Sequence, residues 1–240
     1  MMVSAADSAA INIPLVQRLW GVFVRPKATF QSLAQSMSTW DLVVPLLILL
    51  CLSLTNQALI GPVALEEQRQ RIMQREDVPE ERKEALLERM DGALTRPTRY
   101  VTGIGAVAVW YAFLAGIVMF FGTFILGGQA SYKETLTIVL YASLVGVVEM
   151  ALKIPLIVQL STTRVKTGLV LLLPGSLDGT LIYRFFQRLD FFAIWKIFLV
   201  AMGVAAIYKV EEKRARVILF GAWVLTMFLL AWLLDGRGLA

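Results

Sequence analysis

Glu149 and Lys153 are the residues best placed to do chemistry, because they are two ionisable groups inside the apolar stretch 135–160. Residues four positions apart share one face of a helix, so the opposite charges partly neutralise each other. Pro155 removes a backbone donor just beyond the pair, which loosens a helix locally. We consider two roles, a structural ion pair and a path for ions or protons. The first is favoured, since one pair without further intramembrane acids makes a thin proton path.

Two further polar candidates, Asn56 and Gln57, fall near one end of the apolar stretch 42–61, where we expect them to face protein or the membrane interface. Lys196 falls near the start of the stretch 190–208, where a long side chain can extend to the interface. Asp190 opens that stretch and is expected to cap a helix.

Catalytic, cofactor-binding and metal-binding motifs are missing from the sequence. Histidine is absent, which removes the commonest general base and metal ligand. Cys51 is the single cysteine, so a thiolate cluster is excluded. No glycine-rich phosphate loop or nucleophile elbow is present. We therefore expect no enzyme, no cofactor and no metal.

The composition indicates a protein that lies in lipid. Hydrophobic residues make up 58% of the 240 residues and charged residues 17%, whereas soluble domains have about 45–50% and about 25%. The net charge of +5 is interpreted as attraction to anionic membrane lipids. Nucleic-acid binding is not expected, because no basic run is interleaved with aromatic residues.

Five apolar stretches predict an all-α polytopic membrane bundle. A helix of about 20 residues at about 1.5 Å per residue crosses the hydrocarbon layer. A leucine-rich run within 165–187 is too short to span, and we interpret it as re-entrant or interfacial. Ser131 and Glu134 predict a capping box before the third span. The predicted spans are 42–61, 101–126, 135–160, 190–208 and 216–234.

Residues 1–40 are predicted to form an amphipathic interfacial segment ahead of a membrane domain at 41–240. Leu15, Val16, Leu19, Trp20 and Phe23 recur at helical spacing on one side. The basic residues are expected to face lipid phosphates. The alternative is a helix packed on the protein's own spans. The basic residues that are expected to face lipid phosphates are Arg18, Arg25 and Lys27.

Residues 66–99 form a charged extramembrane insertion with nine acidic and eight basic side chains. We predict two short helices with a break near Val78. A solvated helical hairpin is the favoured interpretation, and a docking surface for a protein partner is the alternative.

An odd number of spans puts the two termini on opposite sides of the membrane. With residues 66–99 left out, eight basic residues lie on the side of the N-terminus and five on the other side. The positive-inside rule then favours a cytoplasmic N-terminus. Including residues 66–99 reverses the preference.

Three segments resemble the Ypt-interacting-protein (Yip) family. They are the stretch Trp20 to Leu33, the stretch Ser131 to Leu144 after Gly127 and Gly128, and the run RLDFFAIWKIFLVAMGVAA at 188–206. The resemblance covers 18–234 without most of 66–99. It implies a five-span α-helical domain with a cytoplasmic N-terminus and no catalytic residues.

Eukaryotic members of the Yip family are linked to small GTPases and vesicle traffic, and carry a long cytosolic N-terminal region. This chain has only about forty residues before its first span by the span length used above. That short region is similar to the bacterial branch and argues against GTPase binding. We therefore expect a protein of the bacterial cytoplasmic membrane.

Two functions are compatible with these patterns. The first is a non-enzymatic membrane adaptor or organiser that acts through helix packing and a protein partner or self-association. The alternative is a small transporter or channel-like protein that uses Glu149 and Lys153.

Overall fold

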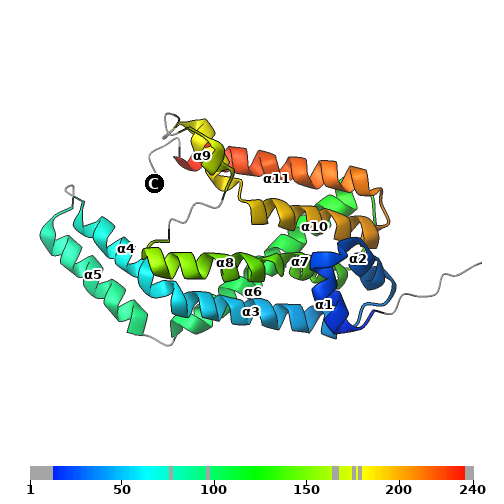
Figure 1. Cartoon of the computed structure of the whole chain (residues 1–240), viewed down its shortest axis with the longest axis horizontal. Coiled ribbons are helices and arrows are strands. Elements are labelled where there is room, and N and C mark those ends of the chain that lie inside the picture. Colours follow the sequence, from blue (N-terminus) through cyan, green and yellow to red (C-terminus); the bar gives the residue numbers. More distant parts are fainter. Residues whose placement is uncertain are drawn as a thin grey trace, which may run out of the picture.

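The structure is a computed structural model that describes residues 13–75, 78–95, 98–163, 168–174, 177 and 180–235. These ranges are helical, apart from turns and one isolated β-bridge between Gly168 and Asp190. Figure 1 shows the helices in chain order. They are α1 (Leu15–Val24), α2 (Pro26–Gln35), α3 (Trp40–Leu59), α4 (Gly61–Met73), α5 (Glu80–Thr95), α6 (Thr98–Phe120), the π-helical turn η1 (Phe121–Ile125), α7 (Tyr132–Ser143), α8 (Val145–Leu160), the 3-10 turn η2 (Leu169–Leu172), α9 (Leu181–Arg188), α10 (Phe191–Tyr208) and α11 (Glu212–Asp235).

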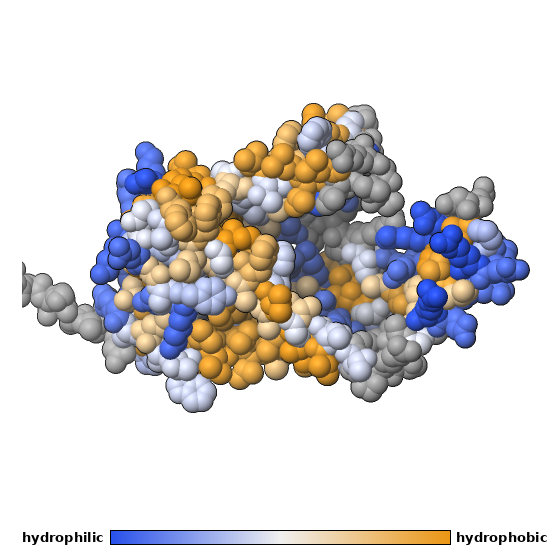
Figure 2. All heavy atoms as spheres, turned by 180° about the vertical axis from the view of Figure 1, so that it is seen from behind, coloured by the Kyte–Doolittle hydropathy of each residue, from blue (hydrophilic) through white to orange (hydrophobic). Residues whose placement is uncertain are grey.

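Five helical segments are long and apolar enough to cross a membrane. Figure 2 shows hydrophobic residues gathered over the middle of the molecule and hydrophilic residues at its two ends, as a bilayer requires. The predicted all-α five-span bundle is confirmed, and the protein is an integral membrane protein. The spans are Trp40–Leu59, Tyr100–Ile125, Tyr132–Leu160, Phe191–Tyr208 and Glu212–Leu233.

The two central spans are α7–α8 and α10. About half of each is buried, 56% and 50%, against 11% in each of the other three spans. Gly203 of α10 makes the close packing possible, because a Cβ there would lie 2.3 Å from Cγ2 of Ile138 on α7. Phe30 of α2 lies against the same glycine and is fully buried. The N-terminal segment therefore contributes to the core of the bundle.

The third span carries its predicted start signal. The backbone N–H of Ser131 donates to Oε2 of Glu134 at 2.7 Å, and the N–H of Glu134 donates back to the Ser131 hydroxyl at 3.3 Å. This reciprocal pair confirms the capping box. The helix is interrupted at Leu144, which divides the span into α7 and α8.

The charged insertion forms two helices, as predicted, with the break between Met73 and Glu80. Figure 1 shows that α4 continues from α3 and that α4 and α5 together extend beyond the ends of the spans. No described side chain of α4 is buried, and Lys83 is the only buried residue among the described side chains of α5. The hairpin therefore adds almost nothing to the apolar core.

The stretch 165–187 is not among the five candidate spans. Its described part consists of η2, the residues that flank it and α9; residues 164–167, 175, 176, 178 and 179 lie outside the described ranges. The N–H of Leu169 donates to the carbonyl of Leu189 at 3.0 Å, which ties this segment to the start of α10. Leu171 and Leu172 of η2 stay exposed.

Candidate functional site: an intramembrane charge cluster

The pair predicted from sequence forms in α8. Nζ of Lys153 donates to Oε1 of Glu149 at 2.6 Å. Both side chains are mostly buried, with 16% and 20% of their surfaces exposed. The four-residue spacing and the helical conformation of α8 bring the two groups to the same face.

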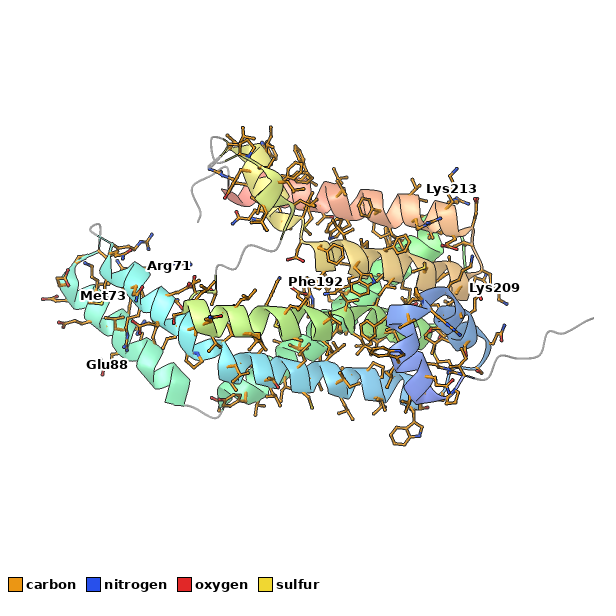
Figure 3. All side chains as sticks on the ribbon, viewed as in Figure 1. Arg71, Met73, Glu88, Phe192, Lys209 and Lys213 are labelled. Carbon is orange, nitrogen blue, oxygen red and sulfur yellow. The ribbon has the colours of Figure 1, made fainter. Side chains whose placement is uncertain are left out.

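A third residue, Asp190, completes the cluster from another span. Nζ of Lys153 also donates to Oδ2 of Asp190 at 2.9 Å. The other oxygen, Oδ1, accepts from the N–H of Phe192 at 2.7 Å, so Asp190 is the predicted N-cap of α10 as well. The Phe192 ring lies 5.7 Å from the Lys153 ammonium, and Figure 3 labels this residue where α8 and α10 face each other.

Lys196, one turn into α10, is half-buried and lies within electrostatic range of Glu149 and Asp190. The cluster therefore holds two acids and two bases with no net charge. Lys153 does not lie at the end of its span, because α8 continues for seven more residues, or about 10 Å, beyond it. Such a neutral arrangement can join two spans inside the membrane, and its Lys153 ammonium is shared between two acceptors.

The other two polar candidates do not bind Lys153. Gln57 lies on α3, where its Nε2 donates to the Ser53 hydroxyl at 3.3 Å. Gln57 also lies against α6, because a Cβ on Gly103 would be only 2.3 Å from its Nε2. Oδ1 of Asn56 is buried without a hydrogen-bond partner in the described part of the chain. Gln57 thus faces protein, as predicted, at the contact between α3 and α6.

A second buried cluster, at the other end of the bundle, was missed by the sequence analysis. Nη1 of Arg18 donates to Oδ2 of Asp41 and to the carbonyl of Ser36, both at 2.8 Å. The Tyr141 hydroxyl donates to Oδ1 of Asp41 at 2.8 Å, and the N–H of Ser38 donates to Oδ2 at 2.8 Å. Arg18 is 4% exposed and Asp41 is 1% exposed. The cluster joins α1, α3 and α7.

The prediction that Arg18 faces lipid phosphates is therefore wrong. A guanidinium in the interior requires a carboxylate to offset its desolvation, and Asp41 supplies it. The position of Arg18 on the helix could have indicated its burial, because it falls on the side of α1 opposite to Val16 and Trp20. Its partner lies 23 residues away, and sequence spacing alone does not reveal such a pairing.

Glu67 attaches the α4–α5 hairpin to the bundle. Its carboxylate accepts hydrogen bonds from the hydroxyls of Thr162 and Thr163 and, at 2.9 Å, from the Thr163 N–H. These hydrogen bonds, from Thr162 first and then from Thr163, lower the pKa of Glu67 from its ordinary 4.5 to about 2. Arg71, four residues on, is more distant at 4.0 Å. The carboxylate thus fixes α4 to the segment that follows α8.

A comparison with protein families agrees with this architecture. The Yip1 domain matches residues 20–233, which include all five candidate spans, Asp41 and the Glu149–Lys153–Asp190 cluster. The family is not a known enzyme family. Searches of curated proteins and of solved structures returned no match. The match covers most of the sequence and the same region as the resemblance noted from sequence, and the chain therefore belongs to the Yip1 domain family.

Proposed function

We propose that this protein is a non-enzymatic membrane adaptor or organiser in which the five-span bundle presents the α4–α5 hairpin to a protein partner. One observation supports this role above all others. The hairpin is long and helical, yet Lys83 is the only buried residue among its described side chains, and the others are exposed or partly exposed. An element that the core does not need is free to serve a surface function.

The hairpin is held in a defined position. Glu67 fixes α4 to the bundle, and Nζ of Lys83 donates to the carbonyl of Met73 at 3.4 Å, which closes the turn between α4 and α5. Figure 3 shows Arg71, Met73 and Glu88 on this hairpin, away from the spans. Basic and acidic side chains alternate on it, with the exposed thioether of Met73 among them. This chemistry fits a partner protein with a charged surface better than it fits lipid.

The test replaces residues 70–97 with a neutral glycine–serine linker and leaves Glu67 in place. We expect unchanged membrane insertion and thermal stability, together with loss of the proteins that co-purify from native membranes in mild detergent. The control keeps the hairpin and replaces Arg82 and Arg89, both exposed, with lysine, which preserves the charge. An unchanged partner list after the linker replacement would refute the partner function and would mean that the hairpin is only a solvated part of the surface. Recovery of a small GTPase would contradict our expectation that none binds.

We also propose the bacterial cytoplasmic membrane as the location, with the N-terminus inside. The end of the bundle that carries α1, α2 and the α10–α11 turn has eight basic and four acidic residues within 13–41, 126–135 and 208–216. With the long 66–99 insertion left out, these eight basic residues exceed the five on the other side, which supports the inside orientation. In a Cys51→Ser background, cysteines at Lys213 and Arg82 should react with an impermeant reagent from opposite sides. Reaction of both from one side would refute the topology.

The transport alternative gains support from the recruitment of Asp190 and Lys196 to the predicted pair. Three ionisable groups within candidate spans, with Asp190 directly before one, exceed what a single structural pair requires. Their hydrogen bonds are nevertheless mutually satisfied at Lys153, which supports the structural role. A measurement of ion flux in proteoliposomes that contain the Glu149→Gln variant separates the two functions.

A further inference from the structure

Helix α1 has two opposite faces. Val16, Trp20 and Val24 follow each other at four-residue spacing, and 74%, 69% and 57% of their surfaces are exposed. Arg18 and Val22, two positions away on the helix, are buried. At 3.6 residues per turn these two sets lie on opposite sides. One side of α1 thus packs on the bundle, and the other is an apolar stripe that is mostly exposed.

Helix α1 lies level with the start of α3 and within the length of α10. Figure 1 shows α1 running across the bundle while the spans run along its long axis. Arg18 binds Asp41 in the first turn of α3, and the adjacent Trp40 is 64% exposed. The Phe23 ring contacts Trp195 of α10 with 6.2 Å between centroids. Trp195 lies thirteen residues before the end of α10 at Tyr208, so α1 lies within the length of that apolar span.

The same end of the bundle is positively charged. Its residue ranges 13–41, 126–135 and 208–216 carry a net charge of +4, whereas the 66–99 insertion carries −1. Figure 3 shows Lys209 and Lys213 at this end with their side chains pointing away from the bundle. The basic residues are Arg18, Arg25, Lys27, Lys133, Lys209, Lys213, Arg214 and Arg216.

We propose that this end, made by α1, α2 and the α10–α11 turn, is a binding surface for anionic lipid. Val16, Trp20 and Val24 insert among the upper parts of the acyl chains, and the exposed lysines and arginines bind the phosphate headgroups above them. Apolar side chains below a basic rim match the layers of a bilayer leaflet. Tryptophan is also enriched at this boundary, as Trp20 and Trp40 would be.

A lipid occupant explains the dimensions of the stripe better than a protein does. A stable protein interface buries about 800 Å² per partner and 20–30 residues on each side. Three residues on a ten-residue helix are too few for such an interface. A bilayer needs no matching surface, because its chains adapt to any apolar stripe at the right depth.

The depth of Trp20 tests the first part of the proposal. The full chain is reconstituted, one copy per nanodisc, in phosphatidylcholine brominated either near the headgroup end or near the far end of the acyl chain. The emission lost in Trp20→Phe gives the contribution of Trp20. We expect this contribution to be quenched by the shallow bromines and protected from acrylamide. Trp110, exposed within the α6 span, provides the control and should respond to the deep bromines.

Two results would overturn insertion of α1. Quenching of Trp20 by acrylamide without quenching by bromine would place the stripe in water. Protection from both quenchers, together with two copies per disc, would mean that a second copy of the chain covers it. Val16→Ala at the same exposed face serves as a second variant that does not touch the buried side of α1, and it should keep the fold and reduce shallow quenching of Trp20.

The preference of the basic end for anionic lipid tests the second part of the proposal, the binding of phosphate headgroups. In nanodiscs of phosphatidylcholine with phosphatidylglycerol, spin-labelled lipids report which headgroup is retained at the protein surface. Each basic side chain near an anionic surface strengthens the attraction by about fivefold. Lys209→Gln with Lys213→Gln removes two such charges and should therefore reduce the preference for phosphatidylglycerol by up to about 25-fold. Arg82→Gln with Arg89→Gln removes the same charge from the hairpin and should leave it unchanged; equal effects of the two double variants would refute the proposal.

Discussion

Lys153 holds two carboxylates at once, and this predicts unequal costs for the loss of each member of the cluster. In Lys153→Met, Glu149 and Asp190 both lose their ammonium partner at 2.6 and 2.9 Å. Breaking a buried ion pair by removing one partner costs about 3–5 kcal/mol. In Glu149→Gln the amide oxygen still accepts from Lys153, and Asp190 still neutralises it. We expect that change to cost about 1 kcal/mol, the value of one hydrogen bond.

Thermal unfolding in detergent, followed by tryptophan fluorescence, measures these costs. For a protein of this size 1 kcal/mol corresponds to about 2–4 °C in Tm. Lys153→Met should therefore lower Tm by about 6–20 °C and Glu149→Gln by about 2–4 °C. The double variant should lie between them, because it removes one charge of each sign. Lys213→Met, at an exposed position, is the control and should change Tm little.

Two outcomes would contradict this reasoning. Equal losses from Glu149→Gln and Lys153→Met, which add in the double variant, would show that the side chains are not coupled. A Glu149→Gln protein that keeps its Tm but loses a measurable ion flux in proteoliposomes would favour transport over the adaptor function. The second outcome would leave the ion pairs of the cluster intact, but it would assign the cluster to transport.

Three further predictions concern the other contacts. Asp41→Asn leaves the Arg18 guanidinium buried without a counter-ion, so Tm should fall by about 6–20 °C in the same assay. Gly203→Ala inserts a methyl group 2.3 Å from a side chain of α7 and should cost about 1–3 kcal/mol, whereas Gly221→Ala has open space and should not destabilise. The pKa of Glu67 is about 2 in the folded protein and ordinarily 4.5, so its contact contributes stability above pH 4.5 that is lost as the pH falls towards 2. Hydrogen exchange of α4 should show this loss of protection, and Glu67→Gln should remove the pH dependence.

The sequence by itself determined the class of the fold, because a bilayer permits few solutions. Apolar stretches of about 20 residues must become helices, since lipid offers no partner to an exposed backbone. The five predicted spans agree with the observed ones to within four residues at each end. The capping box at Ser131 and the break near Val78 depend on neighbouring residues only, and both were predicted correctly.

Within the candidate site, the part that depends on local spacing was predictable from sequence. Glu149 and Lys153 share a helix, so their pairing follows from four-residue spacing. Asp190 was recognised as a helix cap for the same local reason. Its bond to Lys153 joins residues 37 positions apart, and only the packing of α8 on α10 brings them together.

The tertiary structure alone decided which charges are buried and which remain at the surface. Arg18 and Lys27 look equivalent as basic residues near the membrane, yet Arg18 enters the interior to bind Asp41 and Lys27 stays exposed beside Glu212. The side of α1 that packs inward carries Arg18 and Val22, and Arg18 there reaches Asp41 of α3. Such choices arise from contacts between distant segments, whose energies exceed any local preference of a single basic side chain.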